Sequence, residues 1–128
     1  MIIRKTDDQI EKMAAAGAVH ARCMKMLTAK VRPGVTTAEL DEVAEKFIRS
    51  QGGVPTFKGF RGFPGSICAS PNSMVVHGIP GPYKLQKGDI LSIDSGGSYR
   101  GYIGDLARMA IVGEPDAELA DLLGEIET

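Results

Sequence analysis

Two aspartates, Asp94 and Asp105, interrupt the apolar and small residues of the segment ILSIDSGGSYRGYIGDLARMAIV (90–112). The segment is typical of two β-strands that fold back on each other, with the turn at Arg100-Gly101, the only short X-Gly pair between them. With that turn, Gly96 faces Asp105 across the hairpin, and alternation keeps Asp94 on the face of Gly96. The two carboxylates are therefore predicted to form a diagonal pair, roughly 7–8 Å apart at the backbone.

Two carboxylates on one enclosed face repel each other, so one of them is protonated unless a cation lies between them. Arg108 is three positions from Asp105 and alternation sends it to the other face, so no cationic side chain of the hairpin can lie between the two carboxylates. A divalent metal ion can serve, because carboxylate oxygens suit ions such as manganese, iron(II) or cobalt. Spacing alone leaves a second interpretation equally open, in which both acids lie on a solvated face of an antiparallel sheet.

Two helices are predicted before the hairpin. The first covers residues 6–31 and begins at Thr6, which forms a capping box with Gln9. The second begins at Thr36, with Glu39 as its box partner, and ends at Gly52-Gly53. The apolar stripe of the first helix is predicted to contain Ile10, Met13, Ala14, Gly17, Ala21 and Met24. That of the second contains Leu40, Val43, Ala44, Phe47 and Ile48.

The remaining segments surround the hairpin. Residues 54–85 are rich in glycine and proline, with short β-prone runs at SICAS (66–70) and MVVH (74–77). A third helix is predicted after Glu114-Pro115-Asp116, with Leu119, Leu122, Leu123 and Ile126 on one stripe. It has no stop signal before Thr128, so we expect a single domain over 1–128 that is cut within its third helix. Helices combined with an antiparallel hairpin indicate the α/β (α+β) class.

The composition excludes several classes of protein. The 128 residues are 43% hydrophobic and 24% charged, with a formal net charge of −1. Interspersed charges provide no stripe that suits nucleic acid or an anionic membrane. No apolar run approaches the length of a transmembrane span, and no signal-peptide pattern opens the chain. Cys23 and Cys68 match no metal or redox spacing, which favours reduced thiols in a cytoplasmic protein.

Four segments resemble the N-terminal half of type I methionine aminopeptidases. They are IRKTDDQIEKMAAAG (3–17), VRPGVTTAELDEVAEKFI (31–48), GFRGFPGSICASPNSMVVHGIP (59–80) and GDILSIDSGGSYRGYIGD (88–105). The resemblance covers essentially the whole chain and implies half of the pita-bread fold, a curved antiparallel sheet flanked by helices. It also implies removal of the initiator methionine from nascent polypeptides.

The resemblance assigns roles to individual residues. Asp94 matches a bidentate ligand of one metal ion, and Asp105 matches the aspartate that bridges two divalent ions, which could be cobalt, manganese, iron(II) or zinc. His77 matches the catalytic histidine that contacts the substrate near the scissile amide. The pocket for the methionine side chain is matched by Phe57, Phe60, Phe63 and Cys68. The implied partners are N-terminal methionyl peptides and the ribosome.

The residues themselves also permit simpler interpretations. His77 could be a hydrogen-bonded histidine at a strand end, and the phenylalanines could be ordinary core residues. For His20, in the first helix, a structural or solvated role is favoured over a catalytic one.

The remaining ligands of the family's metal site, a histidine and two glutamates, belong to a second half that this sequence does not contain. We therefore expect the chain alone to be inactive and either to associate with itself or to be complemented by a C-terminal half. Two rival functions are a non-catalytic binding module with half of the pita-bread fold and a prolidase-type dipeptidase of the same fold.

Overall fold

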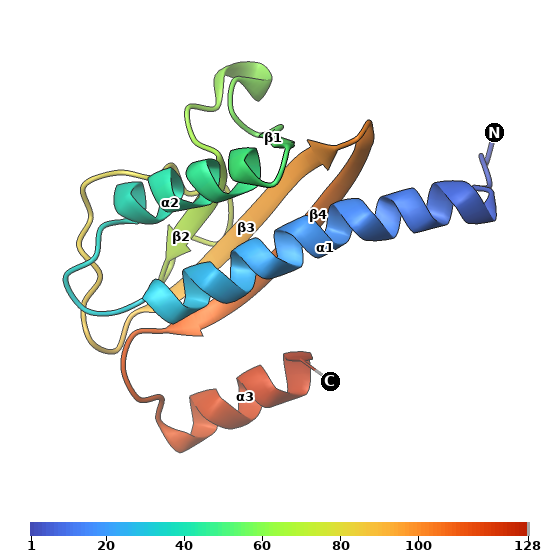
Figure 1. Cartoon of the computed structure of the whole chain (residues 1–128). Helices are drawn as coiled ribbons and strands as arrows, with labels where there is room; N and C mark the ends of the chain where they lie inside the picture. The colour runs from blue at the N-terminus through green and yellow to red at the C-terminus, as the bar shows by residue number, and fades with distance from the viewer. Residues whose placement is uncertain (128) are drawn as a thin grey trace.

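The computed structural model describes residues 1–127 and combines three α-helices with one antiparallel sheet (Figure 1). The helices are α1 (Asp7–Lys30), α2 (Thr37–Ser50) and α3 (Ala117–Glu127), and a short 3-10 helix, η1, covers Phe60–Gly62. The strands are β1 (Gly53–Pro55), β2 (Ile67–Pro71), β3 (Ile90–Tyr99) and β4 (Tyr102–Ile111). This arrangement confirms the α/β class. Among the described helices, none is both long and apolar enough to cross a membrane.

Strand β3 is the centre of the sheet. Strands β1 and β2 both pair with β3 along one edge, and β4 pairs with its other edge over ten residues. Helices α1 and α2 cover one face of the sheet, where the core lies (Figure 1). The core unites residues from every layer and includes Leu27, Leu40, Ile48, Ile67, Leu91 and Ile93, all of which are at most 1% exposed.

The hairpin has the predicted register. The turn at Arg100-Gly101 has φ angles of 50° and 85°, the positive pair that a type I′ turn requires. Gly96 pairs with Asp105, and Asp94 pairs with Ala107. No bulge interrupts the ladder between β3 and β4, so the alternation of side chains is preserved along both strands.

The first two helices begin at the predicted caps. The Thr6 hydroxyl accepts a hydrogen bond from the Gln9 amide at 3.3 Å, and the Gln9 side chain accepts one from the Thr6 amide at 2.9 Å. In the same way, the Thr36 hydroxyl accepts a hydrogen bond from the Glu39 amide at 3.1 Å, and the Glu39 carboxylate accepts one from the Thr36 amide at 2.7 Å. Each box satisfies two backbone donors that a helix start otherwise leaves without partners.

The stripe predicted for α2 is confirmed, whereas the stripe predicted for α1 is wrong. In α2, Leu40, Ala44 and Ile48 are buried, and Val43 and Phe47 pack partly buried against the core. The buried residues of α1 are Ala16, Val19, His20, Cys23, Met24 and Leu27, so Met24 alone of the predicted stripe is buried. The first turns of α1 extend past the hairpin (Figure 1), which leaves Ile10 and Met13 exposed.

Two glycines determine which face of α1 meets the sheet. Gly97 and Gly104 pair across the hairpin, and both lie on its helix-facing side. A Cβ atom on Gly104 would lie 2.6 Å from the carbonyl oxygen of Ala16, and one on Gly97 would lie 2.9 Å from Cε1 of His20. The helix therefore packs directly on the strand backbone, and the residues of α1 that can approach so closely become its buried face.

The predicted strand at residues 74–77 is absent, because the chain turns away after β2. Asn72 has a φ of 53°, and the following Met74, Val75 and Val76 form an exposed loop. The three-residue strand β1 was not predicted, since so short a run has no recognisable period.

Helix α3 begins as predicted. The Asp116 carboxylate accepts a hydrogen bond from the Leu119 amide at 2.8 Å. Its predicted stripe is only partly covered, because Leu119 and Leu123 are half-buried while Leu122 and Ile126 are exposed. The predicted cut at Thr128 lies outside the described residues.

We predict opposite effects of alanine at two neighbouring glycines. Gly104→Ala should lower the free energy of unfolding by about 2 kcal/mol or more, because its methyl group would collide with the α1 backbone. Gly17→Ala, on α1, should raise it by about 0.5–1 kcal/mol, since a Cβ there meets no atom within 4 Å and glycine is a poor helix former. Urea denaturation of both variants measures the difference, and equal stability of Gly104→Ala and the wild type would contradict the close packing.

Candidate metal and substrate site

Asp94 and Asp105 lie on the sheet face opposite α1 and α2, as the register predicts. Asp94 is half-buried, Asp105 is exposed, and the Oδ1 atom of Asp94 is buried without a hydrogen-bond partner among the described residues. The pKa of Asp94 is raised to about 6 by burial, by the negative charge of Asp105 and by a hydrogen bond to Asp105 that favours the protonated form. The net rise of the Asp94 pKa indicates that the negative charge of the pair is not fully compensated within the part of the chain described.

A divalent cation fits this pair chemically. It would neutralise the repulsion and provide a partner for the orphaned oxygen of Asp94. Within residues 1–127, however, no group of three or more histidine, cysteine, aspartate or glutamate side chains is placed to hold a metal ion. Asp94 and Asp105 therefore fit one part of a ligand shell, and their role as metal ligands stays a prediction.

Cys68 lies beside the aspartates as a wall residue. It pairs with Asp94 across β2 and β3, so both side chains share a face of the sheet. The pKa of the Cys68 thiol is raised to about 11 by burial and then by the negative charges of Asp94, Asp105 and Asp41. A thiol with this pKa stays protonated near neutral pH, so Cys68 offers a small apolar surface and no thiolate.

Phe57 covers the glycine between the two aspartates. A Cβ atom on Gly96 would lie 2.6 Å from Cε1 of Phe57, so the ring packs directly on the backbone of β3. Because Gly96 pairs with Asp105, this ring lies next to the carboxylate pair. Two of the four predicted pocket residues, Phe57 and Cys68, therefore lie beside the aspartates.

Phe60 and Phe63 lie on the adjoining loop around η1. Phe60 is 64% exposed, and the guanidinium carbon of Arg61 lies 5.3 Å from the centre of its ring. Phe63 is half-buried. Neither residue is a fully buried core residue, so the interpretation of the phenylalanines as ordinary core does not fit them.

An acidic pair on α2 holds both ends of this loop. The Asp41 carboxylate accepts hydrogen bonds from the amides of Ser66 and Ile67, at 2.7 Å and 2.9 Å. One turn further along α2, Glu45 forms a salt bridge of 2.6 Å with Lys58. This clamp was not predicted, although the spacing of four positions between Asp41 and Glu45 places both acids on one helix face.

His77 lies in the exposed loop after β2, so the simpler interpretation, a histidine at a strand end, is wrong. The loop is tied to β2 by two hydrogen bonds of 2.9 Å, from the Ala69 amide to the Gly78 carbonyl and from the Gly78 amide to the Ser70 hydroxyl. A Cβ atom on Gly78 would lie 2.1 Å from the Ala69 carbonyl oxygen, so glycine is required there. These contacts bring His77 within electrostatic reach of Asp94, where it offsets only part of the rise in the Asp94 pKa that burial and Asp105 cause.

His77 also has an unusual backbone conformation. Its φ is 59°, in the left-handed region that histidine occupies more often than most residues but still at a cost in free energy. The hydrogen bonds of the neighbouring Gly78 hold the loop in this conformation.

The profile of metallopeptidase family M24 matches residues 11–126, and the chain belongs to this family. The family implies divalent metal cofactors, in agreement with the chemistry of the carboxylate pair. The fold is that of half a pita-bread metallopeptidase.

Among individual proteins, the chain is similar to a methionine aminopeptidase from Clostridium acetobutylicum, with 48% identity over 96% of this chain and 50% of the relative. It is also similar to the crystal structure of methionine aminopeptidase from Rickettsia prowazekii, with a TM-score of 0.93, 38% identity and coverage of 97% and 50%. An Xaa-Pro dipeptidase from Bacillus anthracis matches with a TM-score of 0.75 and 26% identity, over 91% of this chain and 32% of the dipeptidase. The resemblance to methionine aminopeptidases is thus confirmed, and the chain spans about half the length of the curated relatives it matches.

We predict that Asp94→Asn stabilises the metal-free chain at pH 7.5. A carboxyl group whose pKa is raised on folding contributes stability below its unfolded pKa of 3.8, and this contribution is lost as the pH rises through about 6. Asparagine stays neutral and can donate a hydrogen bond to Asp105. The gain should be about 1 kcal/mol after allowance for solvent screening, and it should nearly vanish at pH 4.

Urea denaturation in the presence of a chelator, at both pH values, measures this gain. The exposed Asp121→Asn on α3 is the matched control and should leave the free energy of unfolding nearly unchanged. Equal stability of Asp94→Asn and the wild type at pH 7.5 would show that the carboxylate pair is not strained.

Proposed function

We propose that this chain supplies the N-terminal half of a methionine aminopeptidase, which removes the initiator methionine from nascent polypeptides whose second residue is small. The observation that carries the proposal is the pair Asp94 and Asp105, placed on one sheet face with a buried carboxylate oxygen that has no partner among the described residues. The identity of 48% to a methionine aminopeptidase supports the substrate class.

In this proposal Asp94 and Asp105 hold two divalent ions, of cobalt, manganese, iron(II) or zinc. When bound, such ions polarise the carbonyl of the first peptide bond and lower the pKa of water. His77, which already lies within electrostatic reach of Asp94, donates a hydrogen bond to the amide that is cleaved. The His77 side chain is exposed and therefore accessible to a substrate.

The methionine side chain is proposed to pack against Phe57 and Cys68, with the loop that carries Phe60 and Phe63 closing over it. A polarisable thioether packs well against aromatic rings and a protonated thiol. The clamp of Asp41 and Glu45 on α2 supports this assignment, because it fixes the loop at both ends.

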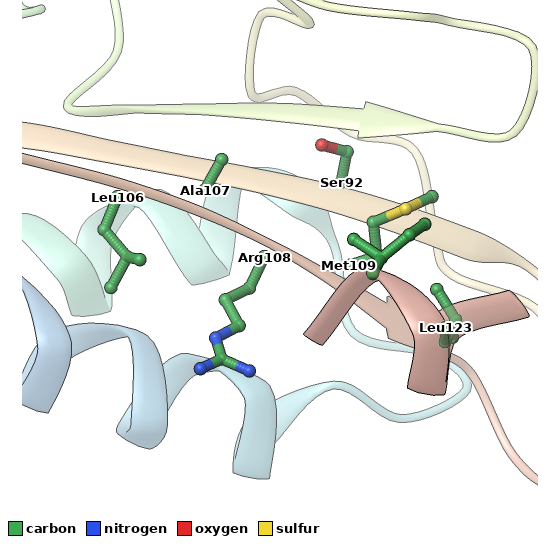
Figure 2. Close-up of a pocket in the computed structure, with 7 residues that line it drawn as sticks. Ser92, Leu106, Ala107, Arg108, Met109 and Leu123 are labelled. Carbon is green, nitrogen blue, oxygen red and sulfur yellow. The ribbon is translucent and has the colours of Figure 1, made fainter. Parts of the chain in front are cut away.

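The outer edge of β4 is proposed to receive the second half of the enzyme. Among the described residues no strand pairs with this edge, and two grooves flank it. One groove, of about 370 Å³, separates β4 from α3, and Figure 2 shows Ala107, Met109 and Leu123 among its lining residues. The other, of about 500 Å³, separates β4 from α1 and includes Ala21 and Met24. Unpaired strand edges next to apolar surface tend to bind another chain segment.

A non-catalytic binding module is the second candidate, and the observation that favours it is the lack of a third metal-binding side chain within residues 1–127. The pair Asp94 and Asp105 argues against it, since a module without metal has no use for an uncompensated carboxylate pair. The Xaa-Pro dipeptidase alternative has lower structural similarity, with a TM-score of 0.75 against 0.93.

We predict that the chain alone binds cobalt or manganese weakly, because two carboxylates are too few for the ligand shell of these ions. Titration of cobalt into the purified chain should give a visible absorption band that Asp94→Asn and Asp105→Asn each remove, whereas Asp121→Asn keeps it. Tight binding, or binding indifferent to both site substitutions, would contradict the proposed half-site.

We also predict that the chain alone releases no methionine from methionyl peptides and associates with itself through the β4 edge. A second copy that pairs along this edge would form an isologous dimer. Light scattering over a concentration series, with a peptide assay on the same samples, tests both statements. A stable monomer at high concentration refutes the association, and metal-dependent release of methionine refutes the inactivity.

A further inference from the structure

A buried histidine lies directly behind the carboxylate pair, on the helix side of the sheet. His20 of α1 is 0% exposed, and its Nδ1 atom is 2.9 Å from the hydroxyl of Ser95, which is also 0% exposed. Its Nε2 atom is buried and makes no hydrogen bond of good geometry among the described residues, although the backbone of Gly97 lies beside it and acts as a hydrogen-bond partner that raises the His20 pKa in part. Burial lowers the pKa of His20, so the imidazole is neutral near pH 7.

This arrangement is costly for a purely structural contact. An apolar side chain at position 20 would fill the same space without desolvating two ring nitrogens, and buried polar groups without partners destabilise a fold. Buried hydrogen-bonded pairs do, however, fix one geometry where apolar packing permits several. The energetic cost is therefore explained if the bond to Ser95 fixes the geometry of a neighbouring residue.

Ser95 is the residue between Asp94 and Gly96 on β3. Because side chains alternate along a strand, Ser95 points to α1 while Asp94 points to the candidate site. A bond that holds the Ser95 side chain also limits rotation of the strand about its own axis at Asp94. Two residues further on, the His20 ring packs against the backbone of Gly97, where a Cβ atom would lie 2.9 Å from Cε1. The ring thus restrains β3 at two points that flank Gly96.

We propose that His20 and Ser95 are a positioning pair, which holds the Asp94 carboxylate in its orientation toward Asp105 without touching a metal ion or the substrate. The consequence for metal binding rests on the proposed function. The orientation of the carboxylate does not depend on the proposed function, and it can be measured in the metal-free chain.

Ser95→Ala is the principal test variant, because it removes the hydroxyl with almost no change in volume. Three-bond NMR couplings of Asp94 in the metal-free chain should indicate one χ1 rotamer in the wild type and an average of rotamers in Ser95→Ala. His20→Asn should retain the wild-type couplings, since an asparagine amide can reach Ser95 from nearly the position of Nδ1. Thr37→Val removes a buried hydroxyl that bonds to Gly81, far along the chain from the hairpin, and is the matched control for a general loss of stability.

Cobalt titration of the same variants provides the second readout. Ser95→Ala should weaken cobalt binding about tenfold and shift the visible spectrum of the bound ion, as expected when the support of a ligand is lost. Thr37→Val should change neither the affinity nor the spectrum. Urea denaturation verifies that each variant is folded at the temperature of the titration.

The possible outcomes separate the two proposals. If the wild type binds no cobalt in a way that depends on Asp94, the proposed function fails, and the couplings alone decide whether His20 and Ser95 orient Asp94. If Asp94 keeps a single rotamer in Ser95→Ala, the positioning pair is refuted, whatever the metal affinity. Averaged rotamers in both Ser95→Ala and Thr37→Val would also refute it, because the effect would then follow stability alone.

Discussion

The register of the β3–β4 hairpin is the constraint on which the rest of the structure depends. The type I′ turn at Arg100-Gly101 determines which residues oppose each other over ten positions. A slip of one residue would exchange the two faces, so Asp94 would enter the core and Ser95 would leave it. The same register places Gly97 opposite Gly104, and this pair sets how closely α1 can approach. The same strand pairing therefore determines both the residues of the core and the residues of the candidate site.

The features that could be predicted from the sequence are those set by local contacts. The helix starts at Thr6 and Thr36 and the hairpin turn depend on residues at most three positions apart, and the structure confirms them. The face shared by Asp94 and Asp105 follows from that turn through simple alternation. The stripe of α2 was also predictable, because this helix is strongly amphipathic and one face of it is clearly apolar.

The features that could not be predicted depend on contacts between distant segments. The small residues of α1 offer more than one apolar face, and the close approach to Gly104 selects among them. The position of His77 depends on hydrogen bonds between Gly78 and β2, which no local pattern indicates. The packing of Phe57 on Gly96 and the exposure of Phe60 follow from the path of a loop. Family resemblance named these residues as a group, whereas the structure distinguishes those beside the carboxylates from those on the loop.

The clamp on α2 has a consequence for how this fold can diversify. Asp41 and Glu45 hold the loop at Ser66 and Lys58. Because these two acids belong to a helix of the core, their contacts offset the entropic cost of closing the loop. Substitutions or small insertions between the two anchors can therefore change the shape of the loop without disturbing strand β2. Apart from Gly65, where a Cβ atom would lie 2.9 Å from Pro80, a population of related sequences can therefore explore new side-chain preferences in this segment while the carboxylate pair remains unchanged.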